Sequence, residues 1–147
     1  MSTSNKVIPA QIHIVNFTIE SASLKSELTV GENEVENHAL SVTYDTQFNL
    51  VEKLVKATIQ VDVTASIDGK EVGEGHFKLV FVFQVDNLQD LTQENDDQLI
   101  VNGGLSNALA SISYSTTRGI LMTRFQGTIL KNFILPVINP NDLLDKS

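Results

Sequence analysis

The sequence has 147 residues, a length that fits one domain, and such a domain buries roughly 70% of the surface that its unfolded chain would expose. The absence of cysteine excludes thiolate catalysis, disulfides and zinc–thiolate sites. A formal net charge of −8, from 18 acidic and 10 basic residues, disfavours nucleic acid and anionic membrane surfaces as partners and favours basic ones.

The N-terminal residues 1–6 are polar and are expected to be disordered. The residues that follow contain no apolar core of about 7 to 15 residues, which a secretion signal would require. No apolar run reaches about 18 residues, the length that spans a membrane. We therefore expect a cytoplasmic protein, without membrane insertion, in which residues 1–147 form a single domain.

Four segments have the side-chain pattern of β-strands, namely residues 11–20, 40–45, 55–68 and 77–85. Residues 55–68 alternate strictly between apolar and polar side chains, which predicts one buried and one wet face, as in an antiparallel sheet. Asp68-Gly69 predicts the turn into the fourth strand. The first strand has apolar residues on both sides, a pattern that fits an interface.

Two acidic segments have too few apolar residues for a core element. Residues 31–37 are expected to form a solvated loop. Residues 86–99 are expected to form a loop with at most one helical turn.

The period of the apolar residues changes after Gly103-Gly104, where Leu105, Ala108, Leu109 and Ile112 fall at helical spacing. Gly119 lies inside this helix and is predicted to pack its backbone closely against a neighbour, whereas Gly127 is a plausible stop. An apolar connector over residues 128–135 follows. A short terminal helix should start at Pro140, because Asn139 is a good N-cap and proline suits the first helical position.

The sequence offers no candidate catalytic residue, metal ligand or cofactor site. His13, His38 and His76 stand far apart, so isolated histidines are preferred over a metal pair. The acidic stretches 32–36 and 94–97 lack the Gly and the distal Glu of a calcium-binding loop. Nucleophile elbows, phosphate-binding loops, dinucleotide fingerprints and basic patches with interleaved aromatics are missing too. We therefore predict a binding protein that has no cofactor and is not an enzyme.

Apolar side chains crowd the segment between the two predicted helices, where a loop would be polar. For any single residue, the simpler interpretation is a place in the core or in a subunit interface. Together with Val80 and Val82 on the nominally wet face of the fourth strand, the set exceeds what one small sheet and one helix need. Such a surplus indicates a surface that binds extended apolar segments or one that serves self-association.

Three motifs, taken in order and spacing, resemble the bacterial export chaperone family SecB over about residues 12–144. Val61-Asp62-Val63-Thr64-Ala65-Ser66-Ile67 is similar to the family's Val-x-Val-Thr-Ala-Ser-Leu strand. Thr117-Arg118-Gly119 is similar to its Ser-Arg-Gly, and Pro136 through Leu143 to its Pro-Val-Asn-Phe-Asp-Ala-Leu. The resemblance implies an α+β fold in which a four-stranded antiparallel Greek-key sheet precedes a long helix, a connector and a short C-terminal helix. It also implies a cytoplasmic homotetramer, a dimer of dimers, that holds unfolded polypeptides without ATP.

The resemblance also implies roles for individual residues. The client-binding groove would be lined by Leu121, Met122, Phe125, Ile129, Leu130, Phe133 and Ile134. The oligomer interface would contain Ile12, Ile14, Leu105, Leu109 and Ile112. Glu20 and Glu74 would dock the export ATPase SecA.

Three alternatives stay open at this point. The first is a SecB-like chaperone devoted to an antitoxin instead of to export. The second is a structural protein whose apolar surplus serves only oligomerisation. The third is a protein that binds a small ligand, for which the one argument is that a single fold can host many functions.

Overall fold

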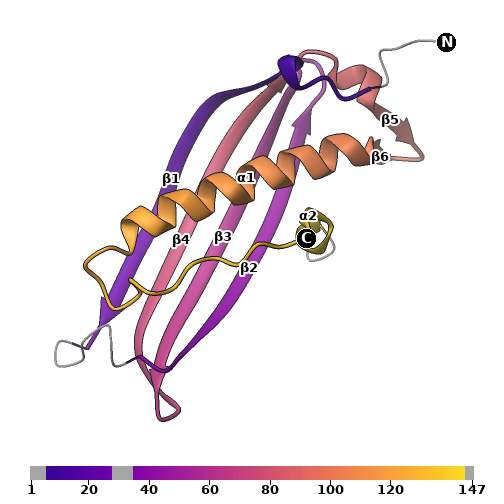
Figure 1. Cartoon of the computed structure of the whole chain (residues 1–147). Coiled ribbons are helices and arrows are strands. Elements are labelled where there is room, and N and C mark those ends of the chain that lie inside the picture. The colour runs from indigo at the N-terminus through magenta and orange to yellow at the C-terminus, as the bar shows by residue number, and fades with distance from the viewer. Residues whose placement is uncertain (1–5, 28–34, 145–147) are drawn as a thin grey trace.

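The structure, a computed structural model, describes residues 6–27 and 35–144 and places one long helix across a four-stranded sheet (Figure 1). The strands are β1 (Ile12–Ser26), β2 (Asn37–Asn49), β3 (Leu54–Ile67) and β4 (Lys70–Val85). Their order across the sheet is β1-β4-β3-β2, and every neighbouring pair is antiparallel. The first strand thus returns to lie beside the fourth, which makes the sheet a Greek key. The predicted fold class is confirmed.

The sheet buries one face against the helix and leaves the other face open. The core side of β3 carries Val55, Ala57, Ile59, Val61, Val63 and Ala65, all fully buried. Burying each larger apolar side chain contributes roughly 1.5–3 kcal/mol, and a one-residue slip would turn all of them to solvent. The alternation therefore fixes the register, in which Val61 pairs with Val42 of β2 on one side and with Phe77 of β4 on the other.

Several stretches of the chain differ from their predictions. Strand β1 continues to Ser26, beyond the expected end at Glu20. Strand β2 is longer at both ends than the predicted 40–45, and β4 begins at Lys70, before the predicted 77–85. The loop predicted for residues 86–99 is wrong in part, because after the expected helical turn η4 (Leu88–Leu91) the chain forms a hairpin of β5 (Thr92–Asn95) and β6 (Gln98–Val101). The predicted lead at residues 1–6, apart from Lys6, and the predicted loop at 31–37, up to residue 34, lie outside the described residues.

Helix α1 (Gly103–Arg124) begins and ends at specific signals. The Asn102 Oδ1 atom accepts hydrogen bonds from the backbone amides of Gly104 at 2.8 Å and Leu105 at 3.2 Å, so it caps the first turn. Gly127, with φ of +75°, turns the chain back just beyond the last turn. Within the described residues, no helix is long and apolar enough to cross a membrane.

The connector returns over the sheet beside α1 and leads to the short helix α2 (Pro140–Leu144) (Figure 1). The predicted cap of α2 is confirmed, because the Asn139 Oδ1 atom accepts a hydrogen bond from the backbone amide of Asn141 at 3.0 Å. The Tyr114 hydroxyl donates to the Pro136 carbonyl at 2.6 Å. This bond ties the connector to α1 and fixes its path over the sheet.

Candidate functional site

The seven residues predicted to line a client groove are divided between the core and the surface. Leu121, Phe125, Ile129 and Leu130 are at most 5% exposed and belong to the hydrophobic core. They face the sheet, so they do not line an open groove in this conformation, and that part of the prediction is corrected. Met122 and Ile134 are 44% and 56% exposed, and Phe133 is partly buried.

The connector enters the core because two glycines in β4 leave room for it. A Cβ atom on Gly73 would lie 2.5 Å from Ile129 Cγ2, and one on Gly75 would lie 2.8 Å from Leu130 Cδ1. The side chains of Ile129 and Leu130 thus fill the space above the bare backbone of β4. Our reading of the sequence missed these glycines, although a glycine inside a strand indicates a close approach of this kind.

Aromatic rings continue this contact from β4 to the edge strand β2. The Phe77 and Phe125 ring centroids are 5.6 Å apart, and those of Phe125 and Phe133 are 6.5 Å apart. The ring of Phe133 in turn lies 5.2 Å from that of His38 on β2. The connector is therefore held on the sheet by a row of side chains.

A hollow of about 390 Å³ opens at the edge of the sheet, between β2 and the final part of the chain. It is lined by residues 40–43 of β2 together with Tyr114, Ile138 and Leu143. Strand β2 is the last strand on this side, and β3 is its one neighbour among the described strands. Its outer backbone groups are thus free to pair with an added strand, right beside an apolar hollow.

A second apolar surface lies at the opposite edge, along β1. Ile14 and Val15 are each 50% exposed, and Phe17 is exposed as well. Phe17 and Ile19 line a hollow of about 510 Å³ against one face of α1 that includes Thr116, Gly119 and Ile120. The close packing predicted at Gly119 is not found within the described chain, since an added Cβ there would meet no atom within 4 Å.

The predicted oligomer residues do not share one surface. Ile14 is exposed and Ile12 is partly buried, both on β1. Leu105 and Leu109 are at most 1% exposed, because the chain's own sheet covers them, and Ile112 is partly buried. The assignment of Leu105 and Leu109 to a subunit contact is therefore corrected to the core.

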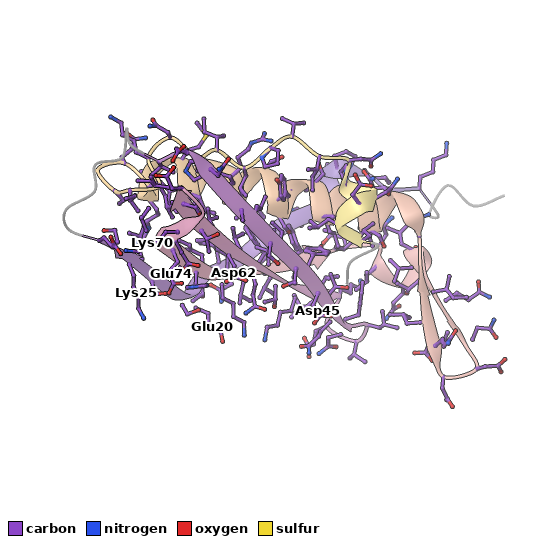
Figure 2. The ribbon with its side chains drawn as sticks, turned by 90° about the horizontal axis from the view of Figure 1, so that it is seen from below. Glu20, Lys25, Asp45, Asp62, Lys70 and Glu74 are labelled. Carbon is purple, nitrogen blue, oxygen red and sulfur yellow. The ribbon has the colours of Figure 1, made fainter. Side chains whose placement is uncertain are left out.

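Charged side chains occupy the open face of the sheet, where Figure 2 labels Glu20, Asp62 and Glu74. Glu20 pairs with Lys78 at 3.4 Å. The His76 Nδ1 atom lies 2.6 Å from Asp62 Oδ1, and its Nε2 lies 3.5 Å from Glu74 Oε1. The hydrogen bond with Asp62 raises the pKa of His76 above its ordinary value, so the imidazolium is favoured.

Glu20 and Glu74 therefore lie on one face, but both have basic neighbours. A hydrogen bond with Glu71 and the charge of His76 hold the pKa of Glu74 below its ordinary value. Among the described residues, no three His, Cys, Asp or Glu side chains are placed to hold a metal ion. The open face of the sheet can therefore bind a partner through charged side chains. The exposed apolar surfaces described above lie at the two edges of the sheet.

No model of a known protein family matches the sequence, and no curated protein matches it either. Among solved structures, the chain is similar to the Mycobacterium tuberculosis SecB-like chaperone Rv1957, solved in complex with a ChAD peptide from the Rv1956 HigA1 antitoxin. The two share 10% sequence identity with a TM-score of 0.62, over 88% of this chain and 91% of that chain. The chain therefore has the SecB-like fold.

Proposed function

We propose that this protein is a holdase chaperone, which binds extended apolar segments of unfolded polypeptides and needs no ATP. The observation that carries the proposal is the free edge of β2 beside the apolar hollow. An extended chain that adds to a sheet edge gains main-chain hydrogen bonds whatever its sequence, while a pocket at the edge selects its apolar side chains. The peptide held by the structural neighbour Rv1957 supports a polypeptide client.

The connector supplies exposed apolar side chains next to this edge. Ile134 is 56% and Val137 is 85% exposed, and Ile138 lines the hollow itself. We therefore propose Phe133, Ile134, Val137 and Ile138 of the connector as client-binding residues, in addition to Leu40, Val42 and Tyr114 at the hollow. The exposed Met122 near the end of α1 is proposed as a further one. The net charge of −8 adds a preference for basic clients that weakens with salt.

Assembly into a homotetramer, a dimer of dimers, is part of the proposal. The exposed residues Ile14, Val15 and Phe17, with the hollow against α1, make a surface that a second copy would cover. This surface lies at the sheet edge opposite to the proposed client edge. One copy can thus contact its partner and a client at the same time.

Two destinations for the client are compatible with this surface. A dedicated antitoxin is favoured by the neighbour's complex. Delivery to SecA in preprotein export would use Glu20 and Glu74, and here the basic neighbours Lys78 and His76 compete for both carboxylates. We therefore prefer the antitoxin role, with export as the second candidate.

A pair of valines with equal exposure tests the client surface. Val137 near the hollow and Val51 in the β2–β3 turn are each 85% exposed, so replacing either by Ser perturbs the fold equally little. Burying a valine contributes about 1.5 kcal/mol, so Val137→Ser should weaken binding of an unfolded client up to about tenfold. The matched Val51→Ser variant should bind as the parent does.

The assays are suppression of client aggregation without nucleotide and fluorescence titration with an extended apolar peptide. Equal loss in both variants, or in neither, would contradict the site. If light scattering shows that the parent protein is a tetramer and it holds no client at all, the protein is instead a structural protein whose apolar surface serves only oligomerisation.

A further inference from the structure

His38 is placed where a histidine ring cannot easily carry a charge. It lies on the core side of β2, opposite Ala65 of β3, with the Phe133 ring 5.2 Å away at an angle of 44°. Its Nε2 atom is buried and has no hydrogen-bond partner among the described residues. This burial lowers the pKa of His38 below the ordinary value of 6.5.

The segment above His38, residues 126–135, has the construction of a lid, and we use that name for it. It leaves α1 at Gly127, with φ of +75°, and ends where the Pro136 carbonyl accepts from Tyr114. The amides of Thr128, Lys131 and Phe133 donate to carbonyls of residues 125–130, within or directly before the lid. Ile129 and Leu130 above the two glycines of β4, and Phe133 against His38, attach it to the sheet.

The charged residues on the elements around His38 are Glu36 just before β2, Asp68 in the β3–β4 turn, Lys70, Glu71 and Glu74 on β4, and Lys131 on the lid. The Glu36 carboxylate accepts a hydrogen bond from the Asp68 amide at 2.9 Å, and Lys70 pairs with Glu27 at 3.6 Å. Glu71 and Glu74 are hydrogen-bonded to each other. Burial, and no neighbouring charge, is the cause of the lowered pKa of His38.

Protonation changes what this ring requires. Both ring nitrogens of an imidazolium are donors, so the buried Nε2–H would need an acceptor that the described residues do not provide. A charged group buried without a partner is unstable unless it reaches water. His38 is partly buried and the Phe133 ring lies against its imidazole. A displacement of Phe133, and of the lid with it, is therefore the movement that brings water to the buried Nε2 atom.

We propose that His38 is an acid-sensitive latch of this lid: protonation of its ring releases Phe133 and uncovers the apolar cluster of Phe77, Phe125 and Leu130. The role of this latch rests on the proposed function: at acid pH, a larger apolar surface beside β2 becomes available to clients. The sign of the effect is fixed. Because the folded pKa is lowered, the stability contributed by neutral His38 is present above the ordinary value of 6.5 and is lost as pH falls through the folded pKa.

The experiment follows the three histidines of the full chain by NMR from about pH 8 to about pH 5.5, together with the fluorescence of the neutral apolar dye Nile red. His38 should titrate below 6.5 and His76, whose hydrogen bond with Asp62 raises its pKa, above it. Dye binding should increase with the same midpoint as His38. If His38 titrates at or above the ordinary value, or if the dye signal does not follow it, the latch does not exist.

Substitution separates the latch from general effects of acid. His38→Phe keeps a ring against Phe133 but cannot be protonated, so its dye signal should stay flat over the same range. If circular dichroism shows that the His38→Phe variant does not fold, the His38→Leu variant is used in its place. A dye signal that still rises in the variant overturns the proposal. Both readouts are independent of client holding, so a protein that held no client would refute the proposed function and leave the latch to be judged by itself.

Discussion

The glycine at position 75 of β4 provides the most direct test of how the connector is held. In Gly75→Ala, the new Cβ atom would lie 2.8 Å from Leu130 Cδ1 and 3.2 Å from the Phe77 ring. Leu130 is fully buried, so it cannot swing into solvent to relieve the contact. Overpacking of this kind costs about 1–3 kcal/mol, whereas replacing a strand glycine by alanine recovers about 0.5–1 kcal/mol.

The expected net loss in the free energy of unfolding is therefore between about 0 and about 2.5 kcal/mol, centred near about 1 kcal/mol. For a chain of this size, each kcal/mol corresponds to about 2–4 °C in Tm. Urea unfolding and calorimetry measure both quantities. Leu130→Ala alone should cost about 2–5 kcal/mol, and in the double variant the loss should be smaller than the sum by about 1 kcal/mol, because the methyl group added at position 75 then has space.

Gly103→Ala is the control, because a Cβ at that exposed first position of α1 meets no atom within 4 Å. It should leave the protein as stable as the parent or slightly more stable. The reasoning fails if Gly75→Ala is as stable as Gly103→Ala, or if the losses at positions 75 and 130 simply add. Either result would mean that Leu130 does not occupy the space above β4.

Two further predictions concern the open face of the sheet. His76→Gln should lower the free energy of unfolding by less than about 1 kcal/mol at about pH 6 and leave it unchanged at about pH 9. The reason is that the pKa of His76 is raised in the folded state, so the stability that its charge contributes is lost as pH rises. Urea titrations at both pH values measure the free energy of unfolding. An equal loss at both pH values would show that the charge of His76 is not the cause. Glu20→Lys should change weak binding to the zinc-bearing tail of SecA by less than about tenfold, or about 1.4 kcal/mol, in titration calorimetry. Tight binding that this substitution abolishes would instead make preprotein export the preferred function.

The sheet and the long helix are predictable from the sequence because each has one buried face. The strict alternation over residues 55–68 matches β3 nearly residue for residue, and the helical spacing after Gly104 matches α1. The β5–β6 hairpin cannot be predicted from the spacing of apolar residues. Its strands have only four residues each, and β5 has no apolar residue. Its turn uses Asp96 and Asp97 at positive φ, where Asn-Gly would be the usual signal.

The site is less predictable because an apolar residue in a connector can face either way. Counting apolar side chains between residues 121 and 135 identifies a surplus but does not say which side chains face the sheet. The answer depends on Gly73 and Gly75, much earlier in the chain, since these positions leave room for Ile129 and Leu130. The resemblance to SecB implied that Leu105 and Leu109 lie in an oligomer interface, although the chain's own sheet is enough to cover them.

The two free edges of the sheet differ in a way that favours a division of roles between them. Strand β2 keeps one register with β3 from Asn37 to Asn49, so its outer edge is a regular ladder that an extended client can follow. Strand β1 has register shifts between Ile14 and Asn16 and between Ile19 and Ser21, and such bulges interrupt the ladder and turn an edge away from further pairing. What β1 offers is side chains, with Ile14, Val15 and Phe17 exposed beside the hollow against α1. A folded second copy, with a fixed surface of its own, fits that edge better than an unfolded chain does.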